Sequence, residues 1–151
     1  MNPFATDWLA LAMPIADRVR GISALRVVSP ITDLSRLTTG QAVDVFPAGH
    51  IAYLGDRITA NDAGARGHGS VQVVDQIWMV IIAVAHYSGG VNPAPMQAAA
   101  GPIIAQVLAL LGGWQPPLTN VRPLIRIPGP AASYPTGRAL YPLTYSARII
   151  S

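Results

Sequence analysis

The residues closest to a catalytic motif are His86-Tyr87-Ser88-Gly89-Gly90. A serine nucleophile on a sharp strand-to-helix turn needs the pattern Gly-x-Ser-x-Gly. Here a histidine stands where the first glycine belongs. Ser88 is therefore better interpreted as the residue that ends a strand than as a nucleophile.

Metal, phosphate and acid–base sites receive as little support. His50, His68 and His86 are not spaced four residues apart, and the absence of cysteine excludes thiolate zinc ligands and disulfides. The glycines of residues 64–69 do not follow the order of a dinucleotide or Walker loop, and no lysine follows them. The seven acidic residues are scattered singly, which argues against paired-carboxylate chemistry. These patterns predict a protein that is not an enzyme and that uses no cofactor or metal.

The composition indicates a surface that other proteins cover. Only 11% of the residues are charged and 51% are apolar, whereas an ordinary soluble domain has about 25% charged residues. The longest apolar run, Ile77–Ala85, is too short to span a membrane, which takes about 20 residues. Arg18, Arg20 and Arg26 form the only loose basic cluster and have no aromatic residues among them, which is a poor nucleic-acid footprint. We therefore expect protein neighbours and no membrane.

The elements that must position these surfaces fit one domain, residues 1–151. The spacing of apolar residues predicts a first helix over Thr6–Val19, with Thr6 as its N-cap, a kink or break at Pro14 and a stop at Gly21. Its buried stripe would be Trp8, Leu11, Ile15, Val19 and Ile22.

Extended segments follow the first helix. Short strands are predicted at Leu25–Val28, ended by Ser29-Pro30, and at Val43–Phe46 and Ile51–Leu54. The polar, glycine-rich stretch Asp56–Ser70 predicts a long loop or the tip of a hairpin.

Val71–Tyr87 is the strongest strand and would span about 55 Å, a length that predicts a bulge. Its first part alternates with polar residues such as Gln76, which predicts one wet face there. From Ile77 onward both faces are apolar, which predicts cover on both sides.

A second helix is predicted to begin at Asn92-Pro93 and to end at Gly112-Gly113. We expect Trp114 to anchor the turn after it, the alternative being an exposed interface residue. Two more strands, Val121–Ile127 and Leu140–Ile150, complete an α+β fold: an antiparallel or mixed sheet with two main helices packed on one face and a long β-hairpin. The buried stripe of the second helix would be Met96, Ala100, Ile103, Val107 and Leu111.

This order of elements resembles the tail terminator proteins of long-tailed bacteriophages, both siphoviruses and Mu-like prophages. The most specific part is Leu110-Leu111-Gly112-Gly113-Trp114-Gln115-Pro116, followed later by Ala139-Leu140-Tyr141-Pro142-Leu143-Thr144-Tyr145. The strand motif Gln76-Ile77-Trp78-Met79-Val80 also fits.

The resemblance implies a homo-oligomeric ring, usually a hexamer, at the head-proximal end of the phage tail in the virion, assembled in the host cytoplasm. Such a ring caps the tail tube, stops its polymerisation and offers a surface to the head–tail connector, and DNA passes through its lumen without specific binding. We expect the interface with the tail tube and connector to use Arg57, Arg66, His68, Tyr134 and Arg138, with the hairpin tip docking through its arginines. A loop that is solvated and has no partner is the alternative.

Other functions remain open from the residues alone. The chain can be another neck or tail component, such as a head–tail connector, a stopper or a tail completion protein. A small enzyme or ligand-binding domain would need a convergent polar pocket, and a nucleic-acid-binding module would bind DNA with strong salt dependence.

Overall fold

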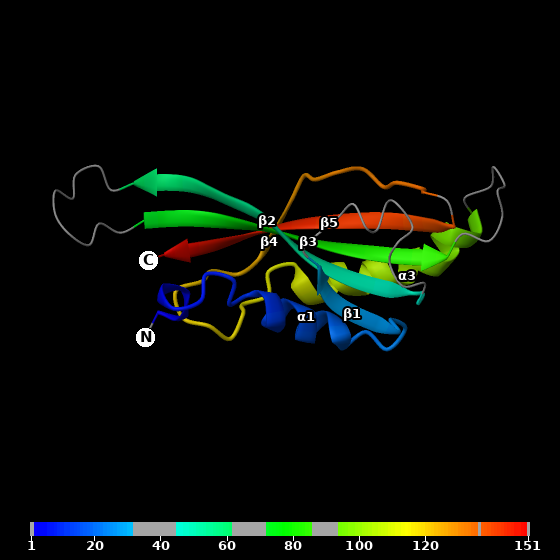
Figure 1. Ribbon diagram of the computed structural model, residues 1–151, viewed down its shortest axis with the longest axis horizontal. Coiled ribbons are helices and arrows are strands. Elements are labelled where there is room, and N and C mark those ends of the chain that lie inside the picture. The colour runs from blue at the N-terminus through cyan, green and yellow to red at the C-terminus, as the bar shows by residue number, and fades with distance from the viewer. Residues whose placement is uncertain (1, 32–44, 62–71, 86–93, 136, 151) are drawn as a thin grey trace.

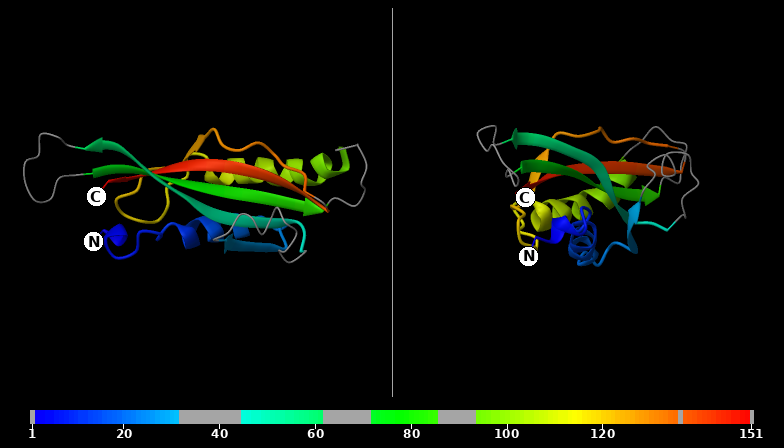
Figure 2. Two further views of the ribbon diagram at one scale, coloured as in Figure 1. Left: turned by 45° about the horizontal axis from the view of Figure 1, so that its top comes forward. Right: turned by 60° about the vertical axis from the view of Figure 1, so that its left-hand side comes forward.

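A mixed sheet of five strands, in the order β1-β2-β3-β5-β4, carries two α-helices on one of its faces (Figures 1 and 2). This arrangement confirms the predicted α+β class. The computed structural model describes residues 2–31, 45–61, 72–85, 94–135 and 137–150.

The first helix is shorter than predicted. A short 3₁₀ helix, η1 (Pro3–Ala5), is followed by turns, and α1 spans Ala12–Arg20. The predicted start at Thr6 is wrong because it would place Pro14 inside the helix. The observed start places Pro14 in the first turn, where its missing N–H costs no helical hydrogen bond. The end before Gly21 is confirmed. Of the predicted stripe only Trp8 is half-buried, and the buried members are Leu11, Ile15, Val19 and Ile22.

The edge strand β1 (Val27–Ile31) pairs in parallel with the start of β2 (Ala48–Asn61). The expectation that Ser29-Pro30 ends the first strand is wrong, because an edge strand tolerates a proline whose missing N–H faces away from the ladder. Val45 and Phe46 precede β2 rather than forming a strand of their own, and residues 43 and 44 lie outside the described part.

The hairpin of β2 and β3 (Gln72–Ala85) is longer than predicted. Asp56–Asn61, expected in the loop, continue β2 and pair antiparallel with β3. The expected bulge exists, but the extra residues belong to β2. The register shifts between Tyr53 and Gly55 and again between Ile58 and Ala60, and Gly55 has a φ of 118° that favours glycine.

The second helix, α3, spans Ala94–Leu111, and residues 92 and 93 of its predicted start lie outside the described part. All five residues of the predicted stripe are buried. Gly113 adopts the left-handed conformation with φ of 73°, as expected for a helix-ending glycine.

The last strand, β5 (Arg138–Ile150), matches its prediction closely and pairs with β3 along its whole length. The predicted strand Val121–Ile127 is largely wrong. Val121 forms only an isolated bridge, and the regular strand β4 covers Ile125–Ile127. Pro123 explains the interruption, because it has no N–H to give to a ladder.

Two apolar layers flank the sheet. On the helix-bearing face, Trp78 and Val80 of β3 pack with Ile15 of α1 and with Ile103 and Val107 of α3. A smaller cluster lies on the opposite face, where the alternate side chains of β3 point. It comprises Ala48, Ala52, Met79, Ile81, Ala83 and Leu140. The prediction that both faces of β3 are covered from Ile77 onward therefore holds from Trp78 to Val84.

Candidate assembly interface

The hairpin end of the sheet carries a row of three charged side chains. Arg57 of β2 is in register with Asp75 of β3, and Asp75 is in register with Arg148 of β5. Arg148 donates from Nε and Nη2 to the two Asp75 carboxylate oxygens, at 2.9 and 3.1 Å, and these hydrogen bonds raise the pKa of Arg148. Arg57 is exposed at the β2 end, so the row has a net positive charge. Arg57 thus lies on a strand rather than in the predicted loop.

Two of the expected interface residues, Arg66 and His68, lie outside the described residues. The hairpin that carries them is confirmed, because β2 and β3 pair antiparallel on either side of residues 62–71. Their contact with a partner stays a prediction.

Tyr134 lies at the other end of the sheet, on the loop between β4 and β5. The residue is 50% exposed, and its ring packs edge-on against Tyr141, with centroids 6.1 Å apart. Burial raises the pKa of Tyr141 to about 12, with a further contribution from Tyr134. The loop is held to β5 by two backbone hydrogen bonds between Ser133 and Leu140, of 3.0 and 2.8 Å. Tyr134 is therefore a surface residue on a fixed loop, as an interface residue needs to be.

Arg138, at the start of β5, is only 4% exposed. Its guanidinium carbon lies 5.7 Å from the ring centroid of Phe46, within the range of a cation–π contact. Burial lowers the pKa of the nearby His50, and the charge of Arg138 lowers it further. Arg138 is thus part of the interior rather than of an exposed contact surface.

Sequence reasoning missed three exposed apolar side chains on β2 and β4. Leu54 and Ile58 of β2 are 40% and 59% exposed, and Ile125 of β4 is 64% exposed. Gly55 is the signal that could have located Leu54, because a glycine inside a strand often marks a bulge. Ile125 carried no such signal, since an apolar residue in a strand is usually buried.

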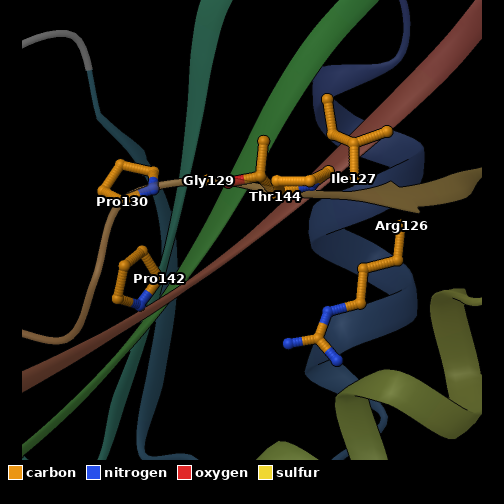
Figure 3. Close-up of a pocket in the computed structure, with 7 residues that line it drawn as sticks. Arg126, Ile127, Gly129, Pro130, Pro142 and Thr144 are labelled. Atoms are coloured by element: carbon orange, nitrogen blue, oxygen red, sulfur yellow. The ribbon is translucent and has the colours of Figure 1, made fainter.

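A cavity of about 370 Å³ lies between β4, the loop after it and β5 (Figure 3). It is lined by Arg126, Ile127 and Thr144, together with Gly129 and three prolines. A Cβ on Gly129 would collide with Thr144 Oγ1, so only glycine fits at this close approach. The polar side chains of the lining are the guanidinium of Arg126 and the hydroxyl of Thr144. This pair suits contact with a partner better than acid–base chemistry.

Within the described residues, no three side chains of the histidine, cysteine or carboxylate type come together to hold a metal. Ser88, His86 and the glycines of residues 64–69 lie outside the described part. Helix α3 is long and apolar enough to cross a membrane, with a mean hydropathy of 1.5. Its buried stripe packs on the sheet, and 28% of the helix is buried in the subunit.

Comparison with known proteins agrees with this picture of a structural subunit. The chain shares its fold with a protein in the virion of a native gene transfer agent particle, with a TM-score of 0.53 and 16% sequence identity. The match covers 97% of this chain and 98% of the other. No curated protein sequence matches the chain. The family model described as phage tail terminator protein matches residues 4–151. A match over nearly the whole length shows that the chain belongs to the phage tail terminator family.

Proposed function

We propose that the protein forms a closed ring, most simply a hexamer, at the head-proximal end of a phage tail. The ring caps the tail tube, stops the addition of tube subunits and presents a surface to the head–tail connector. Family membership over residues 4–151 is the observation that carries this proposal. It already identifies the chain as a structural protein of a phage tail or neck.

The surface of the subunit supports assembly. Leu54 and Ile58 of β2 and Ile125 of β4 expose apolar area on a sheet that is otherwise well packed. Apolar groups that a monomer leaves in water are typical of surfaces that a partner covers.

We further propose that the hairpin end docks on the tail tube or the connector. Arg57 and Arg148 are exposed at the two ends of the charged row, and Asp75 between them neutralises only one of them. A guanidinium binds a partner carboxylate through strong, charge-assisted hydrogen bonds. Arg66 and His68, at the tip, would extend this basic surface, and Tyr134 would contact a partner at the opposite end.

Deletion of the tip tests the docking. Residues 62–69 are replaced by a short Gly-Ser linker, and Arg57→Ser is made separately. If rings form but tails are over-long or do not join heads, the hairpin is the docking element. Rings that support infectious particles with tails of normal length would show that it has no such role. Arg26→Ser, an exposed arginine before β1 and away from the hairpin end, is the matched control.

Removal of the gene from its phage or prophage tests the function itself. We expect over-long tails that do not join heads, and normal tails once the wild-type gene is supplied in trans. Tails of normal length that fail to join heads would instead indicate the alternative role, that of a connector, stopper or tail completion protein.

A further inference from the structure

The sheet has one free edge on each side. Strand β1 covers only Ala48–Ala52 of β2, so the outer edge of Tyr53–Asn61 pairs with no strand in the described part of the chain. On the other side, β4 covers β5, and no backbone group among the described residues bonds to the outer edge of Ile125–Ile127. Open edges present unpaired N–H and C=O groups, and such groups recruit another strand.

The two free edges lie at the same level across the sheet. Ile125 is in register with Ser146, Ser146 with Ile77, and Ile77 with Gly55, the residue after Leu54. The next row runs from Arg126 through Tyr145 and Trp78 to Tyr53. A second copy can therefore be generated by rotating the subunit about an axis parallel to the strands, with little translation along that axis. This rotation brings β4 of one copy beside β2 of the next.

The directions of the strands also agree. β2, β3, β5 and β4 are each antiparallel to their neighbour in this order, so β4 runs opposite to β2. A second copy placed beside β4 would continue the sheet in the same antiparallel manner. This contact joins two different surfaces, and contacts of that kind generate rings when the rotation closes.

The side chains on the two edges are complementary. On the helix-bearing face, Tyr53 and Asp56 both contact the indole nitrogen of Trp8, whose Nε1 donates to Asp56 Oδ2 at 3.0 Å. Arg126 is in register with Tyr145, a residue of the core on that same face. A neighbour's Arg126 would thus lie beside Tyr53 and within reach of exposed Asp56. On the opposite face, the exposed Ile125 and Leu54 would cover each other.

From these relationships we infer that neighbouring subunits join edge to edge, with β4 of one copy paired antiparallel to Tyr53–Asp56 of β2 in the next. The inference rests on the proposed ring and adds to it the surface through which the copies meet. The bulge at Leu54 and the charge of Asp56 make this edge selective, because bulges and charges discourage pairing with unrelated strands.

Charge exchange tests the ion pair across the contact. Arg126→Asp and Asp56→Arg should each reduce the fraction of subunits in rings, and the two changes together should restore it. A double variant that assembles no better than either single variant would contradict the pairing of these two residues.

Cross-linking tests the edge contact itself, and the absence of cysteine makes the background clean. Ile125→Cys and Leu54→Cys are combined in one chain, and the mass of the native assembly is measured. The assembled protein is then treated with a short bismaleimide. We expect the double variant to give a ladder of covalent multimers up to the full ring, and each single variant to give none. The control pair, Ile125→Cys with Met13→Cys, should give no ladder. Met13 is as accessible to the reagent, but it lies on α1 and not on the edge of β2. Intact rings without a ladder would overturn the edge contact and leave the ring in place. A single variant that gives covalent dimers would overturn the edge contact in favour of a two-fold contact, in which the same residue of two copies meets. Absence of any ring would overturn both the edge contact and the proposed ring.

Discussion

Gln76 Nε2 donates a hydrogen bond to the backbone carbonyl oxygen of Trp8, at 2.7 Å. The side-chain oxygen of the same glutamine accepts from Trp78 Nε1, at 3.0 Å. Gln76 is completely buried, so the expectation of a wet face at this position is wrong. The glutamine instead joins the segment before α1 to the centre of the sheet. It also satisfies two polar groups that the core would otherwise leave unpaired.

Replacement of this glutamine should destabilise the fold. Gln76→Leu fills a similar volume but leaves the Trp8 carbonyl and the Trp78 indole N–H without partners. Each unsatisfied buried group costs about 1–3 kcal/mol. Urea denaturation should show the loss, and a stability equal to that of the wild type would contradict the role assigned to this residue.

The packing of α3 on the sheet gives a second prediction. Ile103 is 3% exposed in the helix-bearing core. Ile103→Ala should lower the free energy of unfolding by about 2–5 kcal/mol, because it removes buried methyl groups and leaves a cavity. Met13→Ala is the matched control, since this residue of α1 is 52% exposed and lies outside the proposed contact. A loss below about 0.5 kcal/mol at Ile103, the scale of surface substitutions, would count against the packing described.

Trp114 should act as an anchor at the end of α3. It packs against the core, and the guanidinium carbon of Arg18 lies 5.4 Å from its ring centroid. Arg18 Nε also donates to the carbonyl oxygen of Leu110, at 3.1 Å, which ties α1 to the last turn of α3. Trp114→Ala should lower the melting temperature clearly, and Trp114→Phe less. A Trp114→Ala subunit that melts like the wild type but does not assemble would identify the residue as an interface hot spot instead.

His50 should make stability depend on pH. Its pKa is lowered from 6.5 by burial and then by the charge of Arg138. The unfolded chain therefore binds a proton at a higher pH than the folded chain, so stability falls as the pH drops through and below 6.5. His50→Gln should weaken this fall. Thermal melts at pH 7.5 and 5.5 compare the two proteins, and an equal change in both would exclude His50 as the cause.

Apolar periodicity predicted the parts of the fold in which one period dominates. The stripe of α3 from Met96 to Leu111 repeats at helical spacing, and it fixed both the helix and its buried face. The strands β3 and β5 were predicted to within a few residues, because long apolar runs mark their extent, and Pro142 does not interrupt β5.

Elsewhere, pairing with a neighbour decided the outcome, and a single sequence does not record pairing. Asp56–Asn61 look like a loop by composition but form strand because β3 offers a continuous partner. Pro30 stays within β1 because that strand lies at the edge. Of the expected contact residues, Arg57 and Tyr134 lie on the surface, whereas Arg138 is buried by contacts with residues distant in sequence, such as Phe46.

The mass of the native assembly tests the central claim most directly. The chain has a mass of 15.9 kDa. We predict one closed species at an integral multiple of that mass, six subunits for a hexamer, that persists on dilution and appears as a ring in negative-stain images. A chain that stays monomeric at all concentrations, and forms no ring even when tail tubes are added, would contradict the account.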